Sequence, residues 1–312
     1  MSDQPDKTKG PQPAKVVGRS RASTGAGASA EHVTKAVRAP RAGQGSRRRS
    51  PAGPKSTTAG SLVLERPTTL AIDIGGTGMK AVVLDAGAKL VADRVRVPTP
   101  YPCSPKVLID ALGVLCAPLP AFDRASVGFP GVVRKGVVIT APHFVTLDGK
   151  PGGEVVAELR DAWAGFDITG GLTSRFGRPV RVANDAELQG LEVISGVGLE
   201  LVLTLGTGVG SALFFDGRLM PHLEVSQHPF RKAETYDQQI GNSALLKLGA
   251  KKWRKRVELA FECLDRLINY DRLYVGGGNS RLLVGHVDPS VVIVDNIAGL
   301  LGGIKLWELE GG

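Results

Sequence analysis

The chain has 312 residues, with 39 Lys and Arg against 30 Asp and Glu and a sequence pI near 9.6. Thirteen of the basic residues but only four of the acidic ones lie in residues 1–66, so the net charge of +9 belongs to this segment and residues 67–312 are neutral. No stretch approaches the roughly 18 uninterrupted apolar residues that a membrane-spanning helix needs. The three cysteines lack the spacing of a disulfide framework or a thiolate metal site. We therefore expect a soluble protein of the cytoplasm.

Residues 1–66 are rich in Ser, Gly, Ala, Pro and Arg and contain almost no periodic apolar residues. Such a composition buries too little apolar surface to offset the entropy of ordering the chain, so we expect a disordered basic tail. A basic tail can attach weakly to nucleic acid, to an anionic membrane or to polyphosphate. We favour the simpler alternative, a solvated extension.

The first half of the body alternates strands and helices. Apolar, β-branched runs predict strands at 69–73, 80–85 and 91–97, followed by a helix near 105–117. Strands at 125–128 and 136–140 come next, then helices near 153–163 and 168–177. A strand at 179–183 leads into a helix from 186 to about 195.

The second half opens with the same pattern. We expect strands at 201–206, 210–215 and 218–220, helices near 235–248 and 250–269, a strand at 272–275, a short helix, a strand at 291–294 and a helix at 296–308. Strands that alternate with helices predict α/β layers, and the repeated meander predicts two lobes with a ligand cleft between them. We place the N-terminal lobe at 67–183, the C-terminal lobe at 184–295, and at 296–312 a helix that packs back on the N-terminal lobe.

Two loops rich in glycine and threonine, 73-DIGGTGMK-80 and 203-LTLGTGVGSAL-213, each join one apolar run to the next. Glycine leaves the backbone N–H groups open to an anion, so two such loops facing each other can hold the phosphates of one donor. A third turn, 275-VGGGNS-280, allows a base or ribose to lie against the backbone. The predicted donor-binding residues are Gly75, Gly76, Thr77, Gly78, Gly206, Thr207, Gly208, Gly276, Gly277 and Gly278.

Two carboxylates follow predicted strands. Asp73 ends the first strand and is placed to hold Mg²⁺ through water, while Lys80 either reaches a phosphate or is a lysine at the edge of a strand. Asp185 follows a strand and opens a helix, where an acid is commonly an N-cap without further function. Its place between the two loops favours a second role, as the base that takes a proton from an acceptor hydroxyl. Asn184 beside it suits hydroxyl binding.

These residues carry a resemblance to the ROK family of sugar kinases, closest to its polyphosphate glucokinase branch. The motifs that carry it are DIGGTGMK, GFPGVV, AND, LTLGTGVGSAL, PHLE, HPFRKAETYDQQIG, KKWRKR and LYVGGGNS, spread over about residues 68–308. The resemblance implies a two-lobed actin-like ATPase (ribonuclease H-like) fold. It also implies Mg²⁺ with ATP or polyphosphate as phosphoryl donor, no structural zinc, and a homodimer.

For the site, the resemblance implies that Asp185 is the general base and that Asp73 organises metal and phosphate. It implies that Asn184, Glu224 and Glu234 bind the hydroxyls of the sugar. The chain is then a phosphotransferase with an alcohol acceptor, similar to hexokinases.

The sequence departs from the family at the predicted sugar site. Gln227 stands where a histidine is usual after Glu224, and His143 stands in a loop that often carries asparagine. Glu187 is bulkier than the residues usual two places after the base. We include Gln227 and His143 among the candidate sugar ligands, and these departures put glucose specificity in doubt.

A basic run lies on a predicted helix, with candidate residues Lys251, Lys252, Arg254 and Lys255. Such a cationic face can hold polyphosphate by the counterion release that also drives nucleic-acid binding. It is equally typical of an amphipathic helix whose charged face is solvated, and both interpretations stay open.

The sequence therefore predicts a kinase that phosphorylates the primary hydroxyl of glucose or a related hexose, using polyphosphate, ATP or both. One alternative is a sugar-responsive regulator, but residues 1–66 lack the periodicity of a helix-turn-helix. The other is a pseudokinase that binds sugar or phosphate without turnover, motivated by His143 and Gln227. Asp185 and the two loops argue against it.

Overall fold

The computed structural model describes residues 67–150, 153–294 and 298–309, and for 298–300 only the backbone. The predicted disordered tail, residues 1–66, lies outside these ranges, as do residues 296–297 at the start of the predicted last helix. None of the helices within them is long and apolar enough to cross a bilayer.

One sheet has the strand order β3-β2-β1-β4-β7. The bounds are β1 Thr69–Ile74, β2 Gly78–Leu84, β3 Val95–Pro98, β4 Arg124–Phe129 and β7 Val180–Asn184. β1, β2 and β3 pair antiparallel, whereas β4 and β7 continue the sheet parallel to β1. β1 is buried on both faces apart from Asp73, as its continuous apolar sequence predicts.

A second sheet repeats this arrangement, in the order β10-β9-β8-β13-β14. The bounds are β8 Leu199–Leu205, β9 Val209–Phe215, β10 Arg218–Leu219, β13 Arg272–Gly276 and β14 Val292–Ile293. As in the first sheet, three strands (β8, β9 and β10) form an antiparallel meander, and two more (β13 and β14) continue the sheet parallel to β8. The repeated meander expected from the sequence is confirmed, and with it the α/β class.

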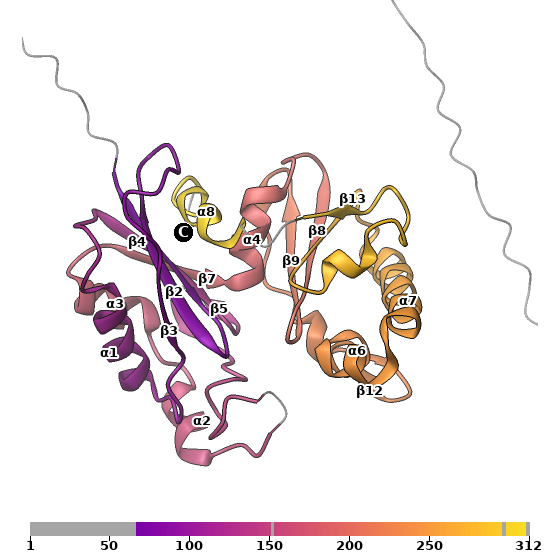
Figure 1. Cartoon of the computed structure of the whole chain (residues 1–312), viewed down its shortest axis with the longest axis horizontal. Coiled ribbons are helices and arrows are strands. Elements are labelled where there is room, and N and C mark those ends of the chain that lie inside the picture. The colour runs from indigo at the N-terminus through magenta and orange to yellow at the C-terminus, as the bar shows by residue number, and fades with distance from the viewer. Residues whose placement is uncertain (1–66, 151–152, 295–297, 310–312) are drawn as a thin grey trace, which may run out of the picture. The chain divides into compact units, whose positions relative to one another are not determined.

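Helices cover the outer face of each sheet (Figure 1). The helices of the first half are α1 Pro105–Cys116, α2 Ala157–Trp163, α3 Ile168–Phe176 and α4 Asp185–Val193, and those of the second half are α5 Tyr236–Ile240, α6 Asn242–Leu248, α7 Ala250–Ile268 and α8 Ala298–Lys305. α1 and α3 pack on the first sheet, where the largest buried aromatic side chain is Trp163. α7 buries Trp253, Val257 and Leu264 against the second sheet, which is the stripe that its 3.6-residue period predicts.

Helices α4 and α8 cross between the two sheets (Figure 1). A Cβ on Gly302 of α8 would lie 1.9 Å from the carbonyl oxygen of Leu188 in α4, so the two backbones touch there. Ser126 of β4 donates a hydrogen bond to the carbonyl oxygen of Gly303 at 2.5 Å. The guanidinium groups of Arg124 and Arg181 both lie over the Trp307 ring, at 5.2 and 4.7 Å from its centroid. These contacts fix the described part of the last helix against the first sheet.

Several predicted elements differ in extent. The helix predicted over 235–248 is broken at Gly241, whose extended backbone separates α5 from α6. The strand predicted at 136–140 is only β6 Val137–Val138, which pairs with β5 Val133–Arg134 across a tight turn. A further hairpin joins β11 Pro229–Arg231 to β12 Glu234–Thr235, and short 3₁₀ helices lie at η1 Val225–Gln227 and η2 Ser280–Leu283.

Candidate active site

A cavity of about 360 Å³ opens at the carboxyl ends of β1, β7, β8 and β13, so both sheets contribute to it. Ligands of α/β proteins commonly bind outside the carboxyl ends of parallel strands. The sequence-predicted residues that line the cavity are Asp73, Gly75, Gly76, Thr77, Lys80, His143, Asn184, Asp185, Gly206, Thr207, Gly208, Glu224, Gln227, Gly277 and Gly278. All three glycine turns therefore meet at one place.

The turns need glycine because other groups approach them closely. A Cβ on Gly76 would lie 2.6 Å from Nδ1 of His143. Gly277 has a φ of +86°, and its Cβ would lie 2.4 Å from the carbonyl oxygen of Leu205. Backbone N–H groups in such turns stay uncovered, which suits the binding of an anion.

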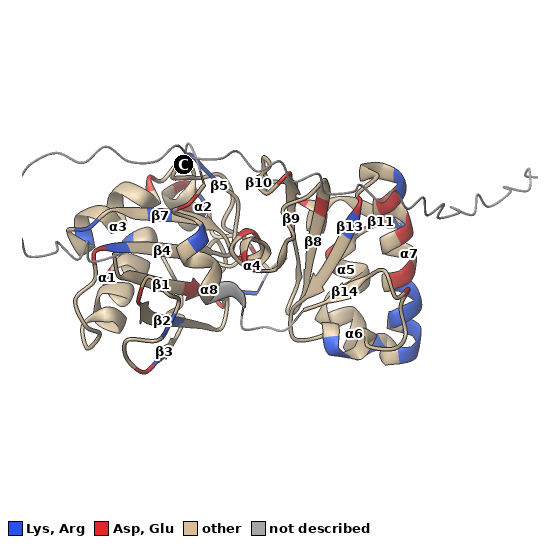
Figure 2. Ribbon diagram, turned by 90° about the horizontal axis from the view of Figure 1, so that it is seen from above, with Lys and Arg blue, Asp and Glu red and all other residues tan. Residues whose placement is uncertain are grey.

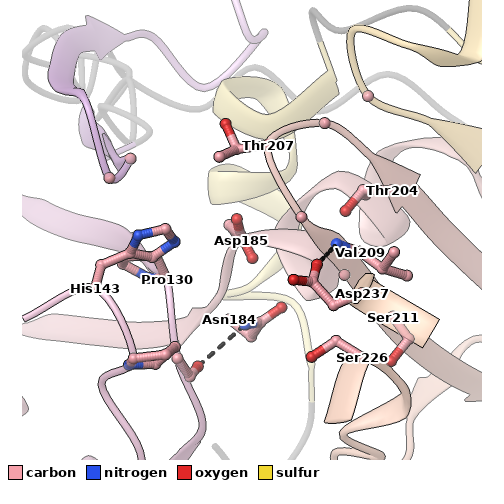
Figure 3. A pocket seen from close by; sticks show the side chains of 18 of the residues that line it. Pro130, His143, Asn184, Asp185, Thr204, Thr207, Val209, Ser211, Ser226 and Asp237 are labelled. Atoms are coloured by element: carbon pink, nitrogen blue, oxygen red, sulfur yellow. Dashed lines mark hydrogen bonds between the residues drawn. The ribbon is translucent and has the colours of Figure 1, made fainter. Parts of the chain in front are cut away.

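The start of α4 places two polar side chains at the cavity. Asn184 is the N-cap, because its Oδ1 accepts a hydrogen bond of 2.9 Å from the backbone N–H of Ala186. Its Nδ2 donates to the carbonyl oxygen of Gly131 at 3.0 Å. Asp185 shares the cap through Oδ1, also 2.9 Å from the N–H of Ala186. Figure 3 shows its carboxylate between Thr207 and Asn184 in the pocket.

The electrostatic surroundings of Asp185 favour a proton acceptor. Burial, and next the negative charge of Asp73, raise the pKa of Asp185 to about 6. Oδ2 of Asp73 pairs with Nζ of Lys80 at 3.1 Å. A carboxyl group with this pKa is ionised at neutral pH, yet it is more basic than an ordinary aspartate.

Histidine and glutamine stand where the sequence departs from the family. Nδ1 of His143 is 2.9 Å from the carbonyl oxygen of Gly149, and because a carbonyl oxygen only accepts, Nδ1 donates this hydrogen bond and Nε2 is left for a ligand. The ring and the Asp185 carboxylate lie on facing sides of the pocket (Figure 3). Nε2 of Gln227 donates to Oγ of Ser226 at 3.0 Å.

Some predicted residues lie away from this cavity. Gly78, Gly276 and Glu234 do not line the cavity. Gly78 at the start of β2 and Gly276 at the end of β13 are nevertheless direct neighbours in the chain of residues that line it. Glu234 is exposed in β12 and accepts a hydrogen bond from Nε2 of Gln239. Its role as a sugar ligand stays a prediction without a contact to support it.

Several lining residues were not singled out from the sequence: Gln189, Thr204, Ser211, His222, Ser226 and Asp237. Asp237 accepts a hydrogen bond of 3.0 Å from the N–H of Val209, and burial raises the pKa of its carboxyl group. In the sequence it looks like an ordinary acid in the first turn of a helix. His222 stands in the PHLE motif, where no local pattern indicates its partners.

The basic run forms the N-terminal half of α7, outside the cavity (Figure 2). Lys251, Lys252 and Lys255 are exposed. Arg254 is half-buried, and its Nη1 donates to the carbonyl oxygen of Leu282 at 3.4 Å. Because η2 follows the third glycine turn, this bond connects the basic face to one wall of the cavity.

Comparison with known proteins identifies relatives. The profile of the ROK family matches residues 69–221. A polyphosphate glucokinase of Mycobacterium leprae is 27% identical over 266 residues, covering 80% of this chain and 76% of the relative.

Solved structures share the fold. The inorganic polyphosphate/ATP-glucomannokinase of Arthrobacter sp. strain KM matches with a TM-score of 0.65 and 30% identity, over 77% of this chain and 98% of that one. A ROK family transcriptional regulator matches with a TM-score of 0.54 and 13% identity, over 77% of each chain. Kinases and a regulator thus share this fold, and its presence alone does not separate the two functions.

Proposed function

Because the chain belongs to the ROK family, we propose that it is a sugar kinase that transfers a phosphoryl group from polyphosphate or ATP to the primary hydroxyl of a hexose. The relative from Mycobacterium is named a polyphosphate glucokinase and the one from Arthrobacter a polyphosphate/ATP-glucomannokinase. The observation that carries the proposal is the position of Asp185, a carboxylate that lines the cavity where the glycine turns meet and whose pKa is raised to about 6.

Asp185 acts as general base in this proposal. Its Oδ1 is held by the N–H of Ala186, which leaves Oδ2 to accept the proton of the acceptor hydroxyl. As that proton leaves, the hydroxyl oxygen forms a bond to phosphorus, and the bond from phosphorus to the donor's leaving oxygen breaks. The products are a hexose phosphate and either ADP or a polyphosphate shorter by one unit. General base catalysis of this kind contributes about 10²–10⁴-fold to the rate.

The acceptor sugar would be bound by the side chains around Asp185. Glu224 accepts hydrogen bonds from sugar hydroxyls, because its carboxylate is ionised: burial opposes the charge, but hydrogen bonds from His222 and Ser226 hold its pKa below the ordinary value. Nε2 of His143 would bind a further hydroxyl. Nδ2 of Asn184 already donates to the carbonyl oxygens of Gly131 at 3.0 Å and Phe129 at 3.5 Å, so Asn184 would accept from a hydroxyl through the second lone pair of its Oδ1.

The donor would be held by the glycine turns. Their N–H groups and the hydroxyls of Thr77 and Thr207 bind phosphate oxygens, and Lys80 neutralises charge beside Asp73. Phosphoryl transfer asks a protein mainly for such positioning and electrostatic stabilisation.

The residues of the proposed donor site fit a magnesium ion. Mg²⁺ is commonly bound by one or two carboxylates together with substrate phosphates and retained waters. Among the described residues, no cluster of three or more His, Cys, Asp and Glu is arranged to hold a metal. Asp73 would hold the ion through water, beside the donor phosphates. When bound, the ion neutralises phosphate charge.

The basic half of α7 supports polyphosphate as a donor. Cations at the N-terminus of a helix face the positive end of the helix dipole, which is unfavourable by some tenths of a kcal/mol each, and α7 has no acid in its first turn. An anionic ligand would remove this repulsion. In this proposal a long polyphosphate would extend from the glycine turns to Lys251 and Lys255, whereas ATP would stay within the cavity.

A coupled assay of the purified chain against a panel of hexoses, with ATP and polyphosphate compared in parallel, tests the proposed function. Turnover of a hexose supports it, whereas sugar binding without turnover supports the regulator or the pseudokinase. We also expect a homodimer, as the resemblance implies, and light scattering of the purified chain checks this.

Asp185→Asn should lower kcat by at least about a hundredfold while sugar affinity changes only a few fold, because a base acts mainly in the transition state. The matched control is Asp93→Asn, an exposed aspartate that does not line the cavity. Turnover within about tenfold of wild type would remove Asp185 from the mechanism.

A further inference from the structure

His222 lies between two carboxylates that come from different parts of the chain. Its side chain is 6% exposed. Nδ1 is 3.0 Å from Oε1 of Glu187 in α4, and Nε2 is 3.5 Å from Oε2 of Glu224. The segment that carries His222 and Glu224 lies between β10 and η1 and has no regular secondary structure.

Each carboxylate has a second, independent anchor. Oε2 of Glu187 accepts a hydrogen bond of 2.9 Å from the backbone N–H of Asn184, which completes the capping box of α4. Oε1 of Glu224 accepts one of 2.5 Å from Oγ of Ser226. The line of contacts therefore runs from the N-terminus of α4 through His222 to η1.

The imidazole has to be charged to satisfy this arrangement. A carboxylate only accepts, so both ring nitrogens face acceptors, and only the imidazolium carries a proton on each nitrogen. Burial opposes that charge, but the hydrogen bonds with Glu187 and Glu224 outweigh it and raise the pKa of His222 to about 9. Without the cation, the two carboxylates on either side of the ring would repel each other.

We propose that His222 is a positioning residue that ties Glu224 to helix α4, so that the sugar-binding carboxylate keeps a fixed distance from Asp185. This inference rests on the proposed function. Glu187, the bulkier residue two places after Asp185, is the other half of the tie: its longer side chain reaches both the helix N-terminus and the imidazole. The structure thus gives a physical role to a departure from the family pattern.

Acceptor binding should depend on the contact between His222 and Glu224, whereas donor binding should not. The side chain of Glu224 is 36% exposed, so little besides His222 and Ser226 restrains it. When the cation is lost, repulsion from Glu187 moves Glu224 away or leaves one carboxyl group protonated. Either outcome weakens the acceptor site, while the glycine turns that hold the donor are not touched.

A double-mutant cycle with His222→Gln and Glu187→Gln tests the tie, with glucose as the acceptor probe, or the best hexose of the panel if glucose is not turned over. His222→Gln should raise the KM of the acceptor about 10- to 100-fold, with the KM of ATP changed less than about threefold. The double variant should recover at least about threefold of that loss, because Glu187 no longer repels Glu224. The Kd of the sugar, measured by calorimetry without donor, should likewise be lowest for wild type, higher for the double variant and highest for His222→Gln.

Three results would overturn the inference. Independent effects of the two substitutions would show that no tie exists, and equal increases in the KM of acceptor and donor would show a general structural role. An unchanged acceptor KM in His222→Gln, with active wild type, would refute the inference alone. A wild type that neither binds nor phosphorylates any hexose would instead refute the proposed function, and this inference with it. Should His222→Gln fail to fold, Glu187→Gln carries the same comparison of acceptor and donor KM.

Discussion

The charge on His222 links the stability of the fold to pH. A free histidine has a pKa of 6.5; burial in the folded chain works against the charge, but the hydrogen bonds to Glu187 and Glu224 raise the pKa to about 9. Since one pKa unit corresponds to about 1.4 kcal/mol, the shift corresponds to about 3 kcal/mol of the free energy of unfolding. A group whose pKa is raised by folding stabilises fully below its unfolded pKa. This contribution is therefore complete below pH 6.5 and is lost as pH rises to about 9.

Urea unfolding of wild type and His222→Gln near pH 6 and again near pH 9 measures this contribution. The difference in free energy of unfolding between the two proteins should shrink by about 3 kcal/mol over this range. Burial also raises the pKa of Cys103 and Cys116 to about 12, so ionisation of these thiols in the unfolded chain weakens the fold at high pH. Both proteins share that effect, and it cancels in the difference. A difference that does not depend on pH would refute the charged imidazole.

Three further predictions concern packing, the donor and the acceptor. Gly302→Ala should lower the free energy of unfolding in urea by about 1–3 kcal/mol because its Cβ meets a backbone oxygen. Gly303→Ala, whose Cβ would meet only side-chain atoms, at 3.1 Å (Ser126 Cβ), 3.4 Å (Ala71 Cβ) and 3.6 Å (Ser126 Oγ), should stay within about 1 kcal/mol of wild type. Reversing the exposed lysines of α7 to glutamate should raise the KM of long polyphosphate at least about tenfold and that of ATP by less than about twofold, with Arg266→Glu at the far end of α7 as control; equal effects on both donors would contradict a polyphosphate track. The substituted lysines are Lys251, Lys252 and Lys255. Gln227→His with His143→Asn should raise kcat/KM for glucose about tenfold if the departures weaken the sugar site, whereas a fall would show that the native side chains make equivalent hydrogen bonds.

Local patterns predicted the sheets well because each strand is recognisable from its own residues. β1 and β8 are largely apolar runs that are followed by a glycine turn, and this alone indicated both meanders. The merged helix over 235–248 was wrong because Gly241 takes an extended conformation, and a Cβ there would lie 2.6 Å from the carbonyl oxygen of Asp237. The lobe boundaries after residues 183 and 295 stay predictions.

The candidate site also combines residues that the sequence indicated with residues that it did not. Asp73, Asp185 and the glycine turns belong to contiguous motifs, and the structure brings them to one cavity. His222 could not be found from the sequence, because its partner Glu187 lies 35 positions away and meets it only in the folded chain. A histidine in an irregular segment has no periodicity that would indicate a buried ion pair.

The packing of α8 has a consequence for how the chain folds. Ser126 bonds to Gly303, 177 positions later, and Trp307 bonds back to Ser126 across 181 positions. Ile304 covers Ala71 and Val82 on the inner face of the first sheet. During synthesis at roughly 5–20 residues per second, this face therefore stays uncovered for roughly 10–35 seconds after β4 has left the ribosome. Contacts of such long sequence separation also slow folding. The first half of the chain should accordingly be the part that chaperones bind on the ribosome, although its sheet is encoded first.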